Sequence, residues 1–274
     1  ADIEKDAASQ IGAFLAGGRR VERERPLRPD GTFAEGTIRL VTSAIHTVKP
    51  LQVAIPRGRL TVVTGVSGSG KTTMVLESLV PALEAVTQGR KVPEHVVEGV
   101  AEGIEHVKLI DATPIGINVR STVATYANVH DELRKVYAHT QDARRHGLKS
   151  GDFSYNTGSL RCPVCDGTGS ISLDVQFLPD VEVPCPDCHG SRYAKAACQV
   201  RYANGAGVSH SLPELMDMDV SAALEFCREM KTIRSKLRVL QSLGLGYLRL
   251  GEDTPGLSGG EAQRLKLASE MGKG

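Results

Sequence analysis

Residues 65–72 of this 274-residue chain read Gly-Val-Ser-Gly-Ser-Gly-Lys-Thr. The stretch fits the phosphate-loop pattern G-x-x-x-x-G-K-[ST] at every defined position. The β-branched run 59–64 before it predicts a short buried strand, and residues 71–85 after it predict a helix. This setting suits the motif, because loop N–H groups and the positive helix N-terminus converge on one anion. We therefore expect an α/β fold with a nucleotide site rather than a plain glycine-rich turn.

The residue types in this loop predict how it binds ATP. Lys71 is expected to reach the β- and γ-phosphates, and the Thr72 hydroxyl is expected to ligate Mg²⁺. The glycines allow the backbone to curl around the phosphates. The nucleotide-binding residues predicted here are Gly65, Ser67, Gly68, Ser69, Gly70, Lys71, Thr72 and Thr73.

A second glycine-containing turn, LSGGE at residues 257–261, lies far downstream. Ser258 with Glu261 three residues later predicts a capping box at a helix that begins near Gly260. The turn also resembles the LSGG signature of the ABC ATPase class, in which the signature of one nucleotide-binding unit faces the phosphate loop of another. That resemblance implies that Ser258, Gly259 and Gly260 contact a γ-phosphate held by a different lobe. A capped helix N-terminus is itself a good phosphate site, so both interpretations can hold.

Two Cys-x-x-Cys pairs predict a metal site. They are Cys162 with Cys165 and Cys185 with Cys188, a spacing typical of a four-cysteine structural zinc site. Four thiolates fill a tetrahedral coordination sphere, so zinc catalysis is not expected. His189 is expected to be exposed or to lie behind the ligands, and Cys198 and Cys227 are expected to be buried thiols.

Composition limits the partners and the compartment. The net charge of +1 neither predicts nor excludes a nucleic-acid partner, and with aromatic residues at 4% no stacking platform stands out. The chain shows no export signal and no apolar run long enough for a membrane span, so we expect a cytoplasmic protein with reduced cysteines. Flanking the cysteine pairs are the predicted DNA contacts, namely Arg161, Arg192, Lys195 and Arg201. The densest basic stretch comprises Arg134, Lys135, Arg144, Arg145, His146 and Lys149. The alternative is that these are scattered, solvated charges.

The chain divides, by pattern, into four parts. We predict a lead-in with a charged run at 1–36, an ATP-binding core at 37–118, an insertion domain at 119–256 that contains a zinc module at 161–193, and a signature loop and helix at 257–274. Periodicity predicts strands at 37–48 and 106–111 and helices at 125–138 and 219–243, and residues 142–152 read as a loop or an exposed helix.

Together these motifs resemble the UvrA family, whose members carry zinc modules between their phosphate loops and their signatures. The matching segments are GVSGSGKTT (65–73), PIG (114–116), ATY (124–126), FLPDVEVPC (177–185), GLGYLRLG (244–251) and LSGGEAQRLKLASE (257–270). The resemblance implies the C-terminal nucleotide-binding half of a DNA-damage-recognition ATPase with a partial ABC-type core. It also implies ATP, Mg²⁺ and Zn²⁺ as cofactors, and damaged duplex DNA, a UvrB-like subunit and a second copy of the protein as partners.

The chain departs from the family pattern at two places. Ala112 stands where the family usually has a glutamine, which hints at a divergent paralogue such as those that protect antibiotic producers. The chain also ends at Gly274, before the family's strand with Asp-Glu and its switch histidine, so an isolated chain is expected to hydrolyse little ATP. Residues 106–111 imitate that strand but precede the signature, so the order of motifs disfavours them.

Two other classes remain as alternatives. Residues 162–169, CPVCDGTG, also fit the CxxCxGxG repeat of DnaJ-type chaperones, which would make the chain a zinc-stabilised binding module without nucleotide. A P-loop kinase is disfavoured, because LSGGEAQR would have no role in one.

Overall fold

The computed structural model describes residues 3–6, 9, 11–20, 31–100, 103–111, 113, 115, 118, 120–173 and 181–271. They belong to two compact units, Ala1–Val107 and Lys108–Gly274, named unit 1 and unit 2 here. Ala112 and residues 21–25 of the charged run, for which the sequence raised expectations, lie outside the described residues.

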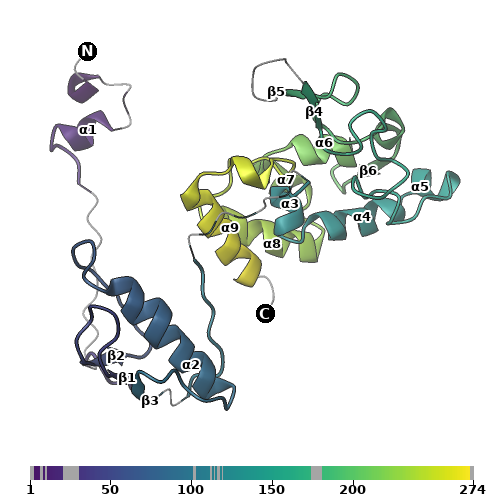
Figure 1. Cartoon of the computed structure of the whole chain (residues 1–274). Coiled ribbons are helices and arrows are strands. Elements are labelled where there is room, and N and C mark those ends of the chain that lie inside the picture. The colour runs from purple at the N-terminus through teal and green to yellow at the C-terminus, as the bar shows by residue number, and fades with distance from the viewer. Residues whose placement is uncertain are drawn as a thin grey trace. The chain divides into compact units, whose positions relative to one another are not determined.

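Unit 1 is built on a three-stranded antiparallel sheet with the order β2-β1-β3. The strands are β1 (Thr37–Thr42), β2 (Leu51–Pro56) and β3 (Val96–Val100), and a helix made of η2 (Thr73–Leu79) and α2 (Val80–Thr87) lies against the sheet (Figure 1). Leu40, Ala82 and Val96 form the buried core between them. Two short helices, η1 (Ile3–Lys5) and α1 (Gly12–Leu15), precede the sheet.

Three expectations for unit 1 have clear outcomes. The strand predicted at 37–48 is confirmed in its first half as β1, and the helix predicted at 71–85 is confirmed, with the π-helical turns of η2 at its start. The buried strand predicted at 59–64 is wrong: the segment is irregular, and the side chains of Leu60 and Val62 are 94% and 71% exposed. A strand needs a neighbour for its N–H and C=O groups, and no described segment pairs with this one.

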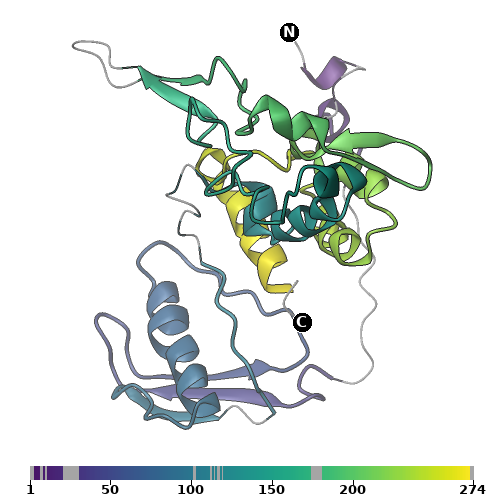
Figure 2. The ribbon, with the colours of Figure 1, turned by 90° about the vertical axis from the view of Figure 1, so that its right-hand side faces the viewer.

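Unit 2 is mostly helical and carries two hairpins. Its helices are α3 (Val123–Tyr126), α4 (His130–Ala138), α5 (Gln141–Arg145), η3 (Lys195–Gln199), α6 (Leu212–Asp217), α7 (Val220–Phe226), α8 (Lys231–Ser242), η4 (Thr254–Gly256) and α9 (Gly259–Met271). The hairpins pair β4 (Ser170–Leu173) with β5 (Val181–Pro184) and β6 (Arg201–Ala203) with β7 (Ser209–Ser211). Figure 2 shows the β4–β5 hairpin projecting away from the helices.

One core holds the helices of unit 2 together. Leu133 of α4, Leu237 of α8 and Leu265 of α9 are completely buried in it. The signature helix α9, expected to begin near Gly260, is confirmed, and it packs into this core through one face.

Two helices predicted as continuous are broken. Residues 125–138 form α3 and α4, which are separated by Asn128 with a φ of 55° in the left-handed region. Residues 219–243 form α7 and α8, because the backbone leaves helical geometry between Cys227 and Met230. The apolar side chains of both segments still pack into or against the core of unit 2, since periodicity reports which face is covered and not whether the helix is continuous.

A further strand predicted at 106–111 is absent, because the described backbone there is irregular. The segment is held instead by side chains: Lys266 of α9 donates to Asp111 Oδ1 at 2.5 Å and to the Thr113 carbonyl at 2.6 Å. Among the described residues, no helix combines the length and the apolar character that a membrane crossing needs.

Candidate functional site

The phosphate loop of unit 1 connects the irregular segment after β2 to the helix that begins at Lys71. Gly68 and Gly70 have φ values of 78° and 85°, in the region that favours glycine. A Cβ on Gly70 would lie 2.4 Å from Val48 Cγ2, so the close approach of Val48 also requires glycine. The residues of the loop are exposed or half-buried, and its backbone is therefore accessible to a ligand.

Lys71 lies across this loop. Its Nζ donates to the Gly65 carbonyl at 2.9 Å and to the Val66 carbonyl at 2.7 Å. The ammonium group is thus held at the loop that leads directly into the helix. A cation and a helix N-terminus at one exposed loop are suited to bind an anion such as phosphate.

The signature turn of unit 2 forms the capping box that its sequence predicts. The Ser258 N–H donates to Glu261 Oε2 at 2.7 Å, and the Glu261 N–H donates to Ser258 Oγ at 3.4 Å. Tyr247 donates to the other carboxylate oxygen, and these hydrogen bonds lower the pKa of Glu261. Glu261 therefore stays ionised at the positive end of α9, where it holds the turn.

The four predicted metal ligands are gathered into one cluster. The sulfurs of Cys162, Cys165, Cys185 and Cys188 all lie within 4.8 Å of one another, and all four residues are buried. The Sγ atoms of Cys162 and Cys185 are 3.9 Å apart, and those of Cys165 and Cys188 are 3.6 Å apart. A tetrahedron with Zn–S bonds of about 2.3 Å has S···S edges of about 3.8 Å, so the thiols fit a tetrahedral metal ion.

Each Cys-x-x-Cys pair lies on a similar turn, and we call these turns the first and the second knuckle (162–169 and 185–192). Gly169 of the first knuckle donates its N–H to Cys165 Sγ at 3.3 Å. Burial alone would raise the pKa of Cys165, but this N–H and the neighbouring thiols lower it to about 7. Such N–H donors stabilise a thiolate, the form that binds metal.

The other predicted thiols and His189 have mixed outcomes. His189 is exposed and does not join the cluster. Cys227 is buried, and burial raises its pKa to about 12. Cys198, predicted to be buried, is exposed in η3, so that expectation is wrong. A lone cysteine in a short helix carries no periodicity that would report its side, which explains the error.

The predicted DNA contacts differ in exposure. Three are at the surface, each paired with a carboxylate: Arg161 with Asp166 at 2.9 Å, Lys195 with Asp187 at 3.3 Å, and Arg201 with Glu214 at 2.9 Å. In the other basic stretch, i,i+3 pairs neutralise Arg134, Lys135 and Arg145.

Arg192 is the exception, since its side chain is only 3% exposed. The guanidinium donates to the Gly167 carbonyl of the first knuckle at 3.1 Å, ion-pairs with Asp253, and lies 5.3 Å from the centre of the Tyr155 ring. The structure thus places Arg192 in the interior, where it cannot serve as a surface contact for DNA. The partners Tyr155 and Asp253 were not predictable from the sequence, because no local pattern links residues so far apart in the chain.

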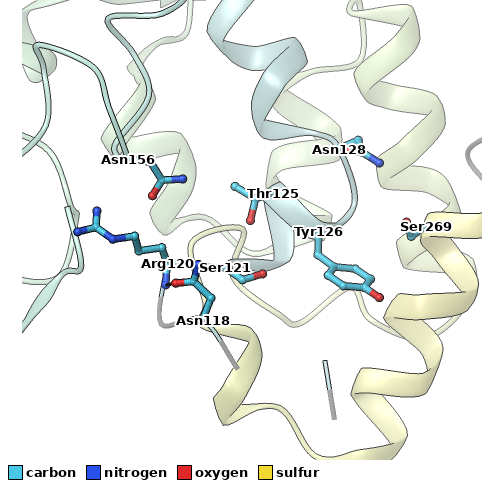
Figure 3. Close-up of a pocket in the computed structure, with 8 residues that line it drawn as sticks. All are labelled: Asn118, Arg120, Ser121, Thr125, Tyr126, Asn128, Asn156 and Ser269. Atoms are coloured by element: carbon cyan, nitrogen blue, oxygen red, sulfur yellow. Dashed lines mark hydrogen bonds between the residues drawn. The ribbon is translucent and has the colours of Figure 1, made fainter. Parts of the chain in front are cut away.

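Unit 2 contains a polar pocket of about 510 Å³ that is lined in part by Arg120. Figure 3 shows Ser269 of α9 across it from Arg120. Arg120 donates to the Asp166 carbonyl at 2.6 Å and pairs with its carboxylate at 3.0 Å, which joins the pocket wall to the knuckle. The remaining lining residues, which carry amides or hydroxyls, are Asn118, Ser121, Thr125, Tyr126, Asn128 and Asn156.

Comparisons with known proteins give one consistent result. No family model matches the chain. The chain is 39% identical over 276 residues to UvrABC system protein A of Thermus thermophilus, covering 99% of the chain and 28% of that protein. The same protein of Bacillus subtilis is 39% identical over 277 residues, with the same coverage.

A solved structure supports the same relationship. The crystal structure of UvrA2 from Deinococcus radiodurans matches 98% of the chain and 31% of that protein, with a TM-score of 0.81 and 37% identity. The chain spans less than a third of the length of these relatives. Over nearly its whole length, and with the expected loop, turn and cysteine cluster in place, the chain belongs to the UvrA family.

Proposed function

We propose that this chain is part of a DNA-damage-recognition ATPase of nucleotide excision repair, from the C-terminal nucleotide-binding half. The observation that carries the proposal is the match to UvrABC system protein A over 99% of the chain. The complete protein would bind damaged duplex DNA, act with a UvrB-like subunit as a homodimer, and work in the cytoplasm. The remaining support comes from the chemistry of each site.

ATP is the proposed ligand of residues 65–73, with Mg²⁺ held by Thr72. An exposed glycine-rich loop, an ammonium group and a helix N-terminus are available there together. At the signature turn, a Cβ on Gly259 or Gly260 would meet nothing within 4 Å. Among the described residues of unit 2, no contact therefore demands glycine at these positions, which fits a turn shaped for close approach by a nucleotide held on another lobe.

Zinc is the proposed occupant of the four-cysteine cluster. The four thiols are buried, and their measured S···S distances are close to the edge length of a ZnS₄ tetrahedron, which suits a closed structural site. When bound, the metal would supply cross-linking of the two knuckles and no catalysis.

Damaged DNA is the proposed partner of the surface around the zinc module, through Arg161, Lys195 and Arg201. Their side chains are 34%, 85% and 39% exposed. Exposed ion pairs contribute little free energy, so a phosphate can replace the paired carboxylate at low cost. Phosphate contacts of this kind position a duplex without reading its sequence, as recognition of distorted DNA requires.

A nucleotide-binding titration tests the proposal. The chain is titrated with a fluorescent ATP analogue and Mg²⁺, alongside Lys71→Ala and the control Lys91→Ala, which removes an exposed lysine elsewhere in unit 1. We expect Lys71→Ala to weaken binding by roughly tenfold or more, which corresponds to about 1.4 kcal/mol, and Lys91→Ala to leave it unchanged. Equal affinities for Lys71→Ala and the parent chain would remove the ATPase assignment and favour the chaperone-type module.

A further inference from the structure

Arg192 connects the two knuckles of the cysteine cluster to each other. Its carbonyl, at the end of the second knuckle, accepts the N–H of Cys162 at 3.0 Å. Its guanidinium donates to the Gly167 carbonyl of the first knuckle at 3.1 Å. The residue adopts a φ of 71°, a left-handed conformation that is unfavourable for arginine, so the surrounding contacts hold it there.

The same side chain reaches the segment that leads into the signature turn. Arg192 ion-pairs with Asp253, which lies five residues before Ser258 in the sequence. The Asp253 side chain is 54% exposed, and its partial burial raises its pKa while Arg192 opposes this shift. The Arg192 side chain is 3% exposed, and the Asp253 carboxylate compensates its buried charge.

Asp253 belongs to a segment that is tied to α3 on both sides. The Val123 N–H donates to the Glu252 carbonyl at 2.9 Å, and the Thr254 N–H donates to the Ser121 carbonyl at 3.0 Å. Thr254 itself is 1% exposed and begins the single turn η4, and only Leu257 separates that turn from Ser258. A change in position at Asp253 therefore passes to the signature turn through a short, hydrogen-bonded stretch.

We propose that the Arg192–Asp253 ion pair is a positioning contact through which the metal-loaded cysteine cluster orders the signature turn at Ser258. The four cysteines would hold the metal across the two knuckles, the knuckles hold Arg192, and Arg192 pairs with Asp253. Loss of the metal frees the knuckles to separate, and the signature turn then loses its anchor. The role of that turn in contacting nucleotide rests on the proposed function, whereas the coupling between cluster and turn does not.

Hydrogen–deuterium exchange of the zinc-loaded chain tests the coupling without nucleotide. The variants are Asp253→Asn, which removes the charge at nearly constant shape, and Asp253→Glu, which restores it. The matched control is Asp217→Asn, because Asp217 also pairs with an arginine, Arg249, at 3.0 Å, but that arginine is 67% exposed whereas Arg192 is 3% exposed. Metal content is measured for each variant, and peptides from α8 serve as the internal reference.

We expect Asp253→Asn to accelerate exchange in peptides covering 253–262 by roughly tenfold while zinc stays bound and α8 is unchanged. Chelation of zinc from the parent chain should accelerate the same peptides, and Asp253→Glu should recover part of the protection. The proposal is overturned if Asp253→Asn matches Asp217→Asn, or if chelation leaves 253–262 protected. It is equally overturned if Asp253→Asn accelerates α8 as much as the turn, since the pair would then serve global stability. A chain that shows this coupling but binds no ATP analogue would refute the proposed function alone.

Discussion

At the scale of single residues, burial alters the protonation of His130. The ring is 3% exposed, and its Nε2 lies 2.7 Å from the Tyr193 hydroxyl. That hydroxyl donates to the Phe153 carbonyl at 2.9 Å, so Nε2 is left to act as the donor. Burial, with help from the charges of Arg134 and Arg192, lowers the pKa of His130 to about 3. The histidine is therefore a neutral, hydrogen-bonded part of the core of unit 2.

This shift predicts a pH dependence of stability. His130 has a folded pKa of about 3 against an ordinary value of 6.5, so its contribution is fully present above pH 6.5 and is lost as the pH falls toward 3. Between pH 7.5 and pH 5.5, the free energy of unfolding of unit 2 should fall by about 1.4 kcal/mol from this group alone. Urea titrations at the two pH values should show the fall in the parent chain and in the control His139→Gln, whose ring is exposed, and should lack it in His130→Gln. The same fall in all three chains would assign the effect to other groups.

At the scale of elements, the zinc module has almost no apolar core of its own. Its buried cluster consists of the four cysteines, with Ile171 of β4 packed against them. The β4–β5 pairing and the two knuckles supply backbone hydrogen bonds but little buried apolar area. A small element of this kind depends on bound metal for its folding free energy. The thiol set was predictable from spacing, whereas the contact of the module with Asp253 was not.

Removal of one ligand should therefore unfold this element. Cys185→Ser replaces a fully buried thiol by a hydroxyl, which binds zinc poorly. Loss of a residue that only hydrogen-bonds to a metal ligand lowers metal affinity roughly 10–100-fold, so loss of a ligand itself should lower zinc affinity by more. Competition with a zinc chelator measures the affinity, and limited proteolysis within 161–193 reports the unfolding. Cys198→Ser is the control, because that thiol is exposed and outside the cluster. Equal zinc affinity in the two variants would contradict a four-thiolate site.

At the scale of the whole molecule, the described residues of each unit form a core of their own, and the two cores differ in size. Unit 1 is organised around Leu40, Ala82 and Val96, and unit 2 around a much larger set of buried side chains that includes Leu133. The phosphate loop belongs to unit 1, and the signature turn and cysteine cluster belong to unit 2. The proposed ATP contacts of this chain are therefore divided between units with separate cores.

Because the two units have separate cores, a destabilising substitution in one core should affect only its own unit. Leu133→Ala should destabilise unit 2 by about 2–5 kcal/mol, because the Leu133 side chain is fully buried and its removal leaves a cavity. Leu40→Ala should act on unit 1 in the same direction. Hydrogen exchange resolved by peptide would show each effect confined to its own unit. Faster exchange in β1–β3 after Leu133→Ala, as strong as in α4, would show instead that the chain unfolds as one cooperative body.

Features set by residues close together in the sequence were predictable, and features that need a distant partner were not. The capping box at Ser258 and the cysteine cluster were predictable, because residues three apart or in paired motifs carry their own geometry. The strand predicted at 59–64 failed, since a β-branched run specifies a preference for strand but not a partner. The breaks at Asn128 and Cys227 were not predicted, because the helical spacing of apolar residues continues across both turns.

By itself the order of amino acids determined the local chemistry of this protein: a loop that can hold phosphate, a capped helix start and four thiols at metal-binding intervals. Only the tertiary structure decided that Arg192 turns inward to Asp253, that His130 is kept neutral, and that residues 59–64 form no strand. The reason is physical. Turn geometry and ligand spacing depend on neighbours along the chain, whereas burial and charge pairing depend on residues that only folding brings together.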